Sequence, residues 1–522
     1  MEKEHFVNNR TTKNKTKEDR LKKEHILPSN NIKFPDETVP FLKKILAIHL
    51  DGIPIKSILY SISKELLSFE LLEYKEFDSG LELTVPEKCR NEFDLIGSVY
   101  QYLVPKYSRL SNGSFFTGQD MVEEIMSGID IHESDTLLDP SCGSGNLLFN
   151  SKIKNPEQVI GLDLDELAIF CCKVNYYLKF GKNAPKPKIF CQDFCIFIRE
   201  NAKKFDYVFC NPPFGATIDV TSLYDTSIKT EDSLTYFVEH SVPLAKKQSI
   251  FILPESVINV KKHTELRKWI LHNTNLLKVR SFNSNFSGTM FPIVTLHINN
   301  KEKNSTFLFN ELPVEKSVIE KMPFYYFRPL DSENTLIVRK VMSKSTQSLL
   351  GSSFGLGIVT GNNKAKVFDA PGPNREPVIT GKDIKKFKIN QPKKYLVYDR
   401  ANFQQVAPDD LYRAPEKVIY KTVSRDMNFA IDNSGTLTLN SANFFIPKNL
   451  TISTKCLVAL LNSDLYDKLN KLLYGENKIS RTNLENLPLP DIDLETQGKI
   501  EKLADSGQYY EMNNLINSLF SL

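Results

Sequence analysis

The sequence lacks the patterns that would place it in several large protein classes. No apolar run approaches the length of a membrane span, and the polar, Lys-rich N-terminus has no apolar segment of a secretory signal. The eight cysteines form no Cys-x-x-Cys pair and no Cys/His cluster with zinc spacing. No G-x-x-x-x-G-K-S/T sequence occurs, which argues against an ATP-hydrolysing P-loop. We therefore expect a cytoplasmic protein with reduced cysteines, no membrane association and no bound metal.

Neither the hydrophobicity nor the charge of the chain is extreme. Hydrophobic residues make up 41% of the 522 positions and charged residues 25%, as in ordinary soluble globular proteins. A chain of this length is expected to form two or three domains. The net charge of +4 is compatible with DNA binding without indicating it, so a DNA-binding surface would need local clusters of basic residues.

The most informative motif is Asn211-Pro212-Pro213-Phe214, which follows an apolar run, residues 207–210, that predicts a buried parallel strand. Two consecutive prolines end the strand in a stiff turn, because each lacks an N–H and has a fixed φ. The turn lies at the carboxyl end of the sheet, where open α/β folds bind ligands. The Asn211 amide oxygen and the Pro212 carbonyl can accept both hydrogens of one exocyclic amino group. Phe214 can stack on the heterocycle that carries it, although a polar loop without such a role is the alternative.

A second motif lies upstream, where a strand-like run, residues 136–138, leads into a glycine turn and then a helical pattern. This is the first unit of a doubly wound domain, and Gly143 and Gly145 let the backbone pass close to a ligand. The features fit either a dinucleotide or S-adenosylmethionine. However, Leu148 stands at the third position of G-x-G-x-x-G, and Asp139 would repel a pyrophosphate. Asp139 instead suits the positively charged end of S-adenosylmethionine.

Two further strand-like runs end in acidic residues. Residues 159–162 are followed by Asp163, which can hold two ribose hydroxyls. Residues 189–191 lead to Asp193, which can accept a hydrogen bond from an adenine amino group, and Phe194, which can stack on the ring. Each is compatible with an ordinary acidic loop. Four ligand-facing loops after four successive strands nevertheless indicate one nucleotide site.

Taken together, these motifs resemble the gamma class of N6-adenine DNA methyltransferases, the TaqI-like enzymes. In chain order they are a leading motif at residues 114–117, motif I at 139–145, motif II at 163, motif III at 193–194, motif IV at 211–214, motif VI at 249–255 and motif VIII at 288–292. The leading motif precedes motif I and a long segment follows motif VIII, which is the order that defines the class. Phe214 departs from the family, which more often has Tyr there, but it keeps the stacking face.

The resemblance implies a function and a set of site residues. The protein would transfer a methyl group from S-adenosylmethionine to N6 of an adenine flipped out of double-stranded DNA. The implied catalytic residues are Asn211, Pro212, Pro213 and Phe214, and the implied stacking residues for the target base are Phe214 and Phe291. The implied cofactor-binding residues are Phe116, Thr117, Asp139, Ser141, Gly143, Gly145, Asp163, Asp193, Phe194 and Asn211. A role of Phe291 in the core strand that follows it is the alternative to stacking.

The fold class expected is α/β, a doubly wound Rossmann-like methyltransferase domain with an N-terminal helical segment and a C-terminal mixed α+β target-recognition domain. We expect residues 1–32 to form a disordered polar tail and residues 33–107 the helical segment. The methyltransferase domain would span residues 108–305 and the recognition domain residues 340–522.

Basic residues interleaved with aromatic residues in the C-terminal region suggest contacts with DNA phosphates. The candidates for DNA binding are Lys382, Lys385, Lys386, Lys388, Lys393, Lys394 and Arg425. The alternative is an ordinary solvated surface.

Several other functions share parts of this pattern. The same motif IV chemistry serves enzymes that methylate RNA bases or protein glutamine, but those generally lack a long segment after the catalytic domain. N4-cytosine enzymes usually have Ser where Asn211 stands. A non-catalytic DNA-specificity subunit and a dehydrogenase are further alternatives. The resemblance favours a monomeric enzyme of a restriction-modification system that protects host DNA from a separate cognate endonuclease.

Overall fold

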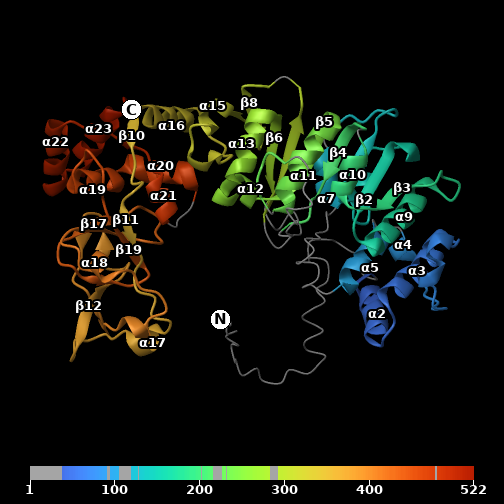
Figure 1. Cartoon of the computed structure of the whole chain (residues 1–522), viewed down its shortest axis with the longest axis horizontal. Helices are drawn as coiled ribbons and strands as arrows, with labels where there is room; N and C mark the ends of the chain where they lie inside the picture. Colours follow the sequence, from blue (N-terminus) through green and yellow to red (C-terminus); the bar gives the residue numbers. More distant parts are fainter. Residues whose placement is uncertain are drawn as a thin grey trace. The chain divides into compact units, whose positions relative to one another are not determined.

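The chain divides into two compact units, Met1–Pro313 and Val314–Leu522. The computed structural model (Figure 1) describes residues 38–90, 94–104, 119–126, 128–201, 203–214, 226–230, 232–282, 292–301, 303–475 and 479–522. The boundary between the units lies in the stretch between the expected methyltransferase and recognition domains.

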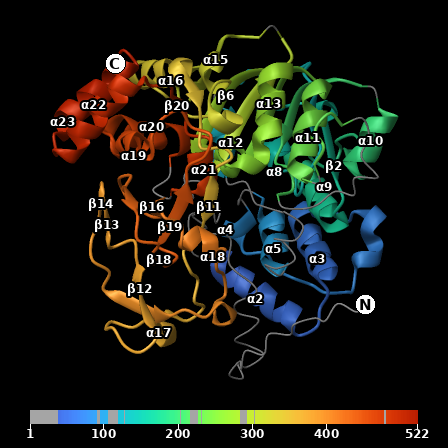
Figure 2. The same ribbon diagram turned by 60° about the vertical axis from the view of Figure 1, so that its left-hand side comes forward.

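Helices open the first unit and pack on a later helix of the same unit. They are α2 (Thr38–Leu50), α3 (Ile55–Leu67), η1 (Leu72–Phe77), α4 (Glu87–Arg90) and α5 (Leu95–Leu103). The apolar positions of α3 and α5 recur every three to four residues, and this face is buried against α9 (Glu166–Phe180). In the shared core, Ile58 and Val99 lie with Phe170 and Val174 of α9. Figure 2 shows α3 and α5 beside α9. The helical segment is therefore joined to the sheet domain by a common hydrophobic core.

A nine-stranded sheet forms the centre of the first unit, in the order β3-β2-β1-β4-β5-β7-β6-β8-β9. The strands are β1 (Leu137–Asp139), β2 (Val159–Asp163), β3 (Lys188–Cys191), β4 (Phe205–Cys210), β5 (Ala245–Pro254), β6 (Asn275–Phe282), β7 (Ile293–Asn299), β8 (Thr306–Phe309) and β9 (Leu312–Glu315). The first five run parallel, and β7 is antiparallel to both β5 and β6. This mostly parallel sheet confirms the predicted fold class.

Helices cover both faces of the sheet. The remaining elements of the unit are α7 (Gln119–Met126), α8 (Asn146–Asn150), η2 (Pro156–Gln158), α10 (Phe194–Glu200), α11 (Ser233–Ser241), η4 (Val242–Leu244), α12 (Ser256–Asn259), η5 (Lys261–His263) and α13 (Thr264–Asn273). Leu137 and Phe209 point to the face covered by α7, α8 and α9, whereas Leu138 and Val208 point to the face covered by α10 and α11. Because successive side chains of a strand alternate, these apolar runs are buried on both faces.

The strand order creates a switch point between β1 and β4. From β1 the chain proceeds to β2 and β3 on one side, and it returns to β4 on the other side. Leu138 pairs with Val208 in parallel register, so the carboxyl ends of both strands reach the same edge. Ligands of open α/β sheets bind at such a crevice.

The second unit is a mixture of small sheets and helices, which confirms the expected α+β class. Its strands are β10 (Ser345–Gln347), β11 (Ser353–Gly355), β12 (Arg375–Ile379), β13 (Ile384–Lys385), β14 (Lys388–Ile389), β15 (Lys394–Val397), β16 (Lys417–Lys421), β17 (Phe429–Asp432), β18 (Leu437–Thr438), β19 (Ala442–Ile446) and β20 (Leu489–Pro490). Its helices are α15 (Lys316–Ile319), η6 (Pro323–Tyr325), α16 (Ser332–Lys344), α17 (Asn363–Lys366), η7 (Arg400–Asn402), α18 (Asp409–Tyr412), α19 (Thr454–Asn462), α20 (Asp464–Tyr474), α21 (Arg481–Glu485), α22 (Leu494–Asp505) and α23 (Tyr509–Leu519).

Two sheets and a hairpin organise this unit. A four-stranded sheet has the order β11-β19-β16-β17, a three-stranded sheet has the order β15-β12-β18, and β13 pairs with β14. Ile419 and Phe444 of the larger sheet share a core with Val378 and Leu396 of the smaller one. Among the residues described in both units, no helix is long and apolar enough to cross a lipid bilayer.

Candidate cofactor and catalytic site

A hydrogen bond joins the glycine turn after β1 to the Asn-Pro-Pro-Phe turn after β4. Ser141 Oγ donates to the backbone carbonyl of Asn211 over 3.1 Å and lies 3.4 Å from Cys210 Sγ. The two turns lie at the same edge of the sheet because β1 and β4 are parallel neighbours. The structure therefore brings together the predicted cofactor-binding and catalytic motifs, which lie about seventy residues apart in the sequence.

Asp139 lies at the end of β1 with 1% of its surface exposed. Its Oδ1 accepts a hydrogen bond from the backbone N–H of Ser141 over 3.0 Å. Burial raises the pKa of the Asp139 carboxyl to about 8, and the negative charge of Asp163 contributes in the same direction, whereas the Ser141 N–H opposes it. A positively charged ligand would favour the ionised form, so this site suits a cation.

Asp163 ends β2 and organises the backbone around the glycine turn. Its Oδ2 accepts from the N–H of Gly143 over 2.8 Å, and its Oδ1 accepts from the N–H of Asp165 over 3.0 Å. Burial raises the pKa of this carboxyl above its ordinary value. Each carboxylate oxygen has a second lone-pair direction, so Asp163 keeps acceptor capacity for ligand hydroxyls.

The two glycines of the turn have different surroundings. Gly143 has a φ of +52°, and a Cβ there would have no atom within 4 Å. Gly145 has a φ of +87°, and its Cβ would lie 2.2 Å from the Phe149 ring and 2.8 Å from Cys172 Sγ. Gly143 thus borders open space, whereas Gly145 permits close packing of the turn on its own core.

Asp193 and Phe194 begin α10. Asp193 caps this helix by accepting from the N–H groups of Cys195 and Ile196 over 2.6 and 3.2 Å. Phe194 is only 3% exposed, and its ring stacks on Phe237 with the centroids 4.9 Å apart. In this structure Phe194 is a core side chain, so its contact with the adenine of a cofactor stays a prediction.

The Asn-Pro-Pro-Phe turn is held from its other side by α11. Ser233 Oγ, in the first turn of that helix, donates to the carbonyl of Pro213 over 2.8 Å. Phe214 is buried, with 8% of its surface exposed. The predicted residues Phe116, Thr117 and Phe291 lie outside the described residues.

Sequence reasoning missed a buried carboxylate beside the glycine turn. Asp94 caps α5 and accepts from the N–H of Gly97 over 2.9 Å, from the amide of Asn175 over 2.6 Å and from the hydroxyl of Ser144. An Asp three residues before a Gly at the start of an apolar helical pattern predicts a cap. This pattern does not predict the contacts of Asp94 with Ser144, 50 positions later, and with Asn175, 81 positions later.

In the second unit, the predicted DNA-binding residues lie mainly on and near the β13–β14 hairpin. Five of them are exposed, namely Lys382, Lys385, Lys388, Lys393 and Arg425. Lys386 lies 3.7 Å from Asp464, and Lys394 forms an ion pair with Asp369. The structure brings the lysines of residues 382–388 to one hairpin, while Arg425 belongs to the separate β16–β17 connection.

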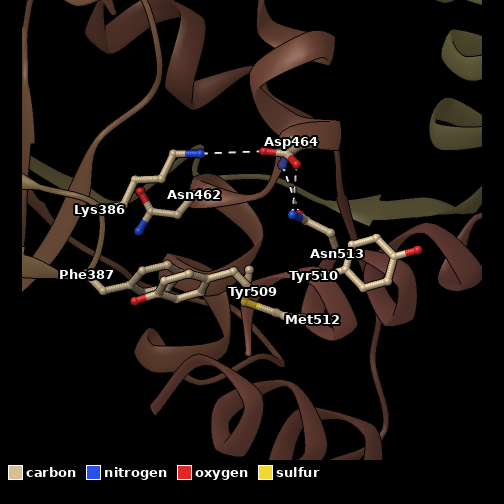
Figure 3. Close-up of a pocket in the computed structure, with 8 residues that line it drawn as sticks. All are labelled: Lys386, Phe387, Asn462, Asp464, Tyr509, Tyr510, Met512 and Asn513. Carbon is tan, nitrogen blue, oxygen red and sulfur yellow. Dashed lines mark hydrogen bonds and ion pairs between the residues drawn. The ribbon is translucent and has the colours of Figure 1, made fainter. Parts of the chain in front are cut away.

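The tip of this hairpin borders a cavity of about 380 Å³ (Figure 3). Phe387, at the tip, has a φ of +64°, and its ring stacks on Tyr509 of α23 with the centroids 5.1 Å apart and the planes 5° apart. The ammonium of Lys386 faces Asp464 across the cavity, and Asn513 donates to Asp464 over 2.9 Å. The hairpin is therefore docked on the C-terminal helices by an aromatic pair and an ion pair.

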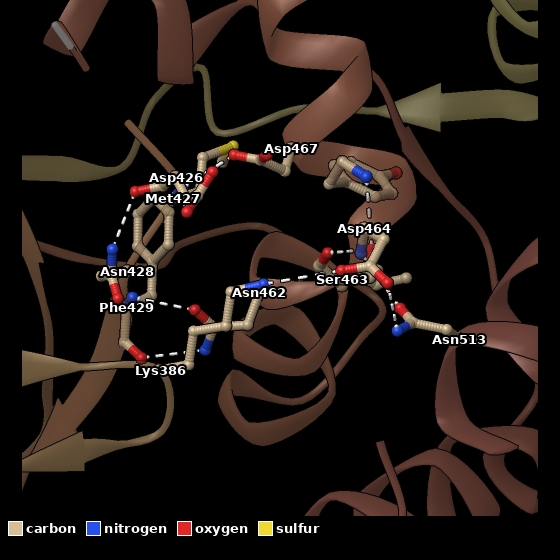
Figure 4. A network of polar contacts seen from close by, with 12 residues as sticks. Lys386, Asp426, Met427, Asn428, Phe429, Asn462, Ser463, Asp464, Asp467 and Asn513 are labelled. Atoms are coloured by element: carbon tan, nitrogen blue, oxygen red, sulfur yellow. Dashed lines mark hydrogen bonds and ion pairs between the residues drawn. The ribbon is translucent and has the colours of Figure 1, made fainter. Parts of the chain in front are cut away.

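A polar network anchors the strand behind the hairpin (Figure 4). The buried Asn462 amide bonds both backbone groups of Phe429, accepting from its N–H over 3.0 Å and donating to its carbonyl over 2.9 Å. The Phe429 carbonyl also accepts from the N–H of Phe387 over 2.9 Å. Asp467 accepts from the N–H of Met427 over 2.8 Å. These bonds tie β17, the hairpin, α19 and α20 into one framework.

Two protein families match the two parts of the chain. Residues 91–323 match the family described as N-6 DNA Methylase, and residues 376–489 match the TaqI-like C-terminal specificity domain. The first match contains the glycine turn, the acidic strand ends and the Asn-Pro-Pro-Phe turn, and the second contains the basic hairpin. Both agree with the resemblance inferred from the motif order.

Individual relatives match a share of the chain. The Type II methyltransferase M.VspI of Vibrio sp. (strain 343) is 26% identical over 327 residues, which are 59% of this chain and 79% of that protein. The tRNA1(Val) (adenine(37)-N6)-methyltransferase of Histophilus somni (strain 2336) is 34% identical over 87 residues, which are 16% of this chain and 36% of that protein.

Among solved structures, the Type IIL restriction-modification enzyme MmeI in complex with DNA matches 96% of this chain and 92% of its own, with a TM-score of 0.55. Its sequence identity is 12%, so this likeness shows the fold alone. The two family matches carry the assignment: residues 91–323 belong to the N-6 DNA Methylase family, and residues 376–489 to the TaqI-like C-terminal specificity domains.

Proposed function

We propose that this protein transfers a methyl group from S-adenosylmethionine to N6 of an adenine in double-stranded DNA, at a sequence chosen by its specificity domain. One observation carries the proposal. The Asn211 turn follows the strand adjacent to the glycine turn, and Ser141 bonds the Asn211 carbonyl over 3.1 Å. A cofactor held at the glycine turn would therefore lie next to the group that receives the substrate amino nitrogen.

The residues at the glycine turn suit S-adenosylmethionine. Asp139 is a buried carboxylate whose raised pKa is relieved by a cationic group, such as the amino group or sulfonium of that molecule. Gly143 offers open space beside the backbone, and Asp163 can accept ribose hydroxyls. When bound, S-adenosylmethionine supplies an electrophilic methyl group.

The Asn-Pro-Pro-Phe turn suits an aromatic amine. The amine of adenine is a poor nucleophile because its lone pair is delocalised into the ring. The Asn211 side-chain oxygen and the Pro212 carbonyl accept its two hydrogens, which shifts the nitrogen towards sp³ geometry and concentrates its lone pair. Phe214 holds the ring by stacking, which is worth roughly 1–3 kcal/mol per base. Phe291 is proposed as the second stacking residue.

The target adenine must leave the duplex, because its amino group cannot reach a buried turn from inside the helix. Unstacking the base from the duplex costs a few kcal/mol, which is comparable with the free energy gained when the base stacks on the aromatic side chains of the protein. We infer that the exposed lysines of the hairpin contact phosphates and keep the DNA in place. The biological role proposed is protection of host DNA from a separate restriction endonuclease, with the protein acting as a monomer.

RNA is the second candidate substrate, since the relative from Histophilus somni is named as a tRNA methyltransferase. That similarity covers 87 residues and leaves most of the chain unmatched. The match to a specificity domain at residues 376–489 favours DNA. The experiment below also tests two further alternatives, methylation of protein glutamine and a non-catalytic role in DNA specificity.

The experiment is sequencing that reports modified bases, applied to DNA from cells expressing the wild-type protein or Asn211→Ala. N6-methyladenine confined to one short sequence, present with the wild type and absent with Asn211→Ala, is expected. Asn201→Ala is the matched control, because Asn201 lies at the end of α10 and bonds only the neighbouring carbonyl of Phe197 among the contacts described.

The opposite results are equally informative. A purified protein that binds S-adenosylmethionine but modifies no DNA base would overturn the DNA assignment and favour RNA or protein amides. Methylation that persists in Asn211→Ala would contradict the proposed role of this turn. N4-methylcytosine in place of N6-methyladenine would show that the base identity is wrong.

A further inference from the structure

Helix α5 contacts both loops at which the cofactor is proposed to bind. Asp94, at its amino end, reaches the glycine turn, and Tyr100, in its middle, reaches the loop after β2. The helix lies outside the sheet and carries none of the seven motifs identified in the sequence. Its contacts therefore have no explanation in the motif set.

Three donors converge on Asp94, and the side chain is 9% exposed. One oxygen accepts from the Gly97 N–H over 2.9 Å and the Asn175 amide over 2.6 Å, and the other accepts from the Ser144 hydroxyl. The same Asn175 amide donates to the Ser144 carbonyl over 2.9 Å. Ser144 is thus fixed through its side chain and its backbone, between the two turn glycines 143 and 145.

The backbone around Asp94 is shaped to permit this contact. Asp94 has a φ of +49°, which is uncommon for a residue with a side chain. A Cβ at Gly97 would lie 2.4 Å from the Asp94 carboxylate and 2.5 Å from Ser144 Oγ. Only glycine therefore allows α5 to approach the turn this closely. Burial raises the pKa of Asp94 to about 6, so the carboxylate is ionised at neutral pH and can accept all three hydrogen bonds.

The second contact involves the loop that follows Asp163. The hydroxyl of Tyr100 donates to Asp165 Oδ2. Asp165 Oδ1 caps α9 by accepting from the N–H groups of Leu167 and Ala168, and the Asp165 N–H donates to Asp163. Tyr100 therefore acts on Asp163 through one intervening residue.

We propose that α5 is a two-point clamp that positions the cofactor loops, with Asp94 fixing the glycine turn and Tyr100 fixing the ribose-binding loop. The inference rests on the proposed function, because it assumes S-adenosylmethionine binds between these loops. Asp94 and Tyr100 are positioning residues that act through Ser144 and Asp165. Preorganised loops lose less conformational freedom on binding, so the clamp raises cofactor affinity.

The test measures the dissociation constant of S-adenosylmethionine by titration calorimetry on the full-length protein. Asp94→Asn and Ser144→Ala are each expected to raise it roughly fivefold to twentyfold, as for one lost charge-assisted hydrogen bond. The double variant should raise the dissociation constant no more than the single variant with the larger effect does, because both substitutions remove the same contact between Asp94 and Ser144. The KM for S-adenosylmethionine should rise equally, with kcat at saturating cofactor within about twofold of wild type.

Tyr176→Phe is the matched control for Tyr100→Phe. Tyr176 is a buried tyrosine of α9 and directly follows Asn175 in the sequence. Its hydroxyl, however, donates over 2.7 Å to the carbonyl of Pro185, which lies beyond the carboxyl end of α9. Tyr100→Phe should weaken cofactor binding about threefold to tenfold, while Tyr176→Phe should leave it within about twofold.

The outcomes separate this inference from the proposed function. A wild-type protein that binds no S-adenosylmethionine overturns the proposed function. A wild type that binds it, with Asp94→Asn and Tyr100→Phe binding equally well, overturns the clamp alone. If Asp94→Asn fails to fold, Ser144→Ala and Tyr100→Phe decide the question, and unchanged affinity in both overturns the clamp. Fully additive effects of Asp94→Asn and Ser144→Ala also contradict it.

Discussion

The hydroxyl of Ser141 donates to the backbone carbonyl of Asn211 over 3.1 Å. It connects residues at the ends of neighbouring parallel strands, β1 and β4, across the switch point of the sheet. Ser233 holds the other side of the same turn through the Pro213 carbonyl over 2.8 Å. The rigid prolines between these two contacts leave few ways for the Asn211 amide to move. Two serine side chains thus fix the Asn211 turn, Ser141 from the glycine turn and Ser233 from α11.

Ser141→Ala should lower the rate of methyl transfer more than it lowers affinity for either substrate. Loss of the bond allows the Asn211 turn to move relative to the glycine turn, and a small misplacement of reacting groups is costly. We expect a decrease of roughly tenfold in the single-turnover rate, measured with saturating DNA and S-adenosylmethionine. Ser151→Ala is the control, since Ser151 Oγ donates to the Leu148 carbonyl at the end of α8. Equal rates in Ser141→Ala and wild type would refute this role.

The two turn glycines should respond differently to alanine. Gly143→Ala places a methyl group in open space, so the free energy of unfolding should fall by only about 1 kcal/mol, because of the φ of +52°. The same methyl group would occupy the space proposed for the cofactor, so cofactor binding should weaken at least tenfold. Gly145→Ala forces a methyl to 2.2 Å from the Phe149 ring at a φ of +87°. It should cost about 2–4 kcal/mol of unfolding free energy. Urea unfolding and calorimetry measure both quantities, and a Gly143→Ala variant with full affinity would contradict the proposed approach of the ligand.

The fold was largely predictable because the apolar runs are short, buried and followed by polar turns. The strand-like runs of residues 136–138, 159–162, 189–191 and 207–210 correspond to β1, β2, β3 and β4. Such runs are recognisable because both faces of a parallel strand are covered by helices. The motif order then predicted the family, which the two family matches confirm.

What could not be predicted depends on contacts between distant residues. Asp94 meets Asn175, 81 positions later, and no local pattern indicates that pairing. Phe194 follows the capping residue Asp193, and its position in the motif predicts a contact with the ligand. In this structure its ring packs on Phe237 in the core. An apolar side chain at a strand end is compatible with either role. Only the packing of the following helices decides between them.

The stability of the unliganded protein should fall as the pH rises towards 8, because of Asp139. Its carboxyl has a pKa of about 8 in the folded protein and about 3.9 in an unfolded chain. The folded state therefore binds the proton more tightly, and the contribution is complete below about pH 4 and lost as the pH rises through 8. The slope is at most about 1.4 kcal/mol per pH unit.

Other buried carboxyls such as Asp163 shift in the same direction, so the difference between wild type and Asp139→Asn isolates this group. Melting temperatures measured from pH 6 to pH 8.5 should fall more steeply in the wild type. Saturating S-adenosylmethionine should flatten the difference, since its positive charge stabilises the ionised carboxylate. Parallel curves for the two proteins would contradict the assignment.

A buried ion pair should control the stability of the second unit. Lys417 Nζ lies 2.6 Å from Asp432, and the two side chains are 0% and 4% exposed. Burial raises the pKa of the Asp432 carboxyl, but the hydrogen bonds from Lys417 and Ser434 and the positive charge of Lys417 lower it more, so the net pKa lies below its ordinary value and Asp432 is ionised. Lys417→Met leaves a buried negative charge and should cost about 3 kcal/mol, measured by urea unfolding. Lys499→Met removes an exposed pair with Glu495 and should cost under about 0.5 kcal/mol. Similar losses in both variants would contradict the argument.

The stacked pair of Phe387 and Tyr509 should be required for tight DNA binding. The stack holds the tip of the basic hairpin on α23, which lies beyond the matched specificity segment, residues 376–489. Tyr509→Ala should free the tip, weaken DNA binding roughly threefold to tenfold and reduce the slope of log affinity against log salt by about 1. Lys385→Ala should produce a similar change in slope, because it removes one phosphate contact directly.

Tyr510→Ala is the control for that comparison, since Tyr510 is the next residue and is 75% exposed. It borders the same cavity but is not part of the stack, so DNA affinity should stay within about twofold of wild type. Cofactor affinity should be unchanged in all three variants, because the proposed cofactor site belongs to the first unit. If Lys385→Ala weakens binding while Tyr509→Ala does not, the hairpin contacts DNA without needing the stack. If neither does, the basic residues of this hairpin form an ordinary solvated surface, and the phosphate contacts lie elsewhere.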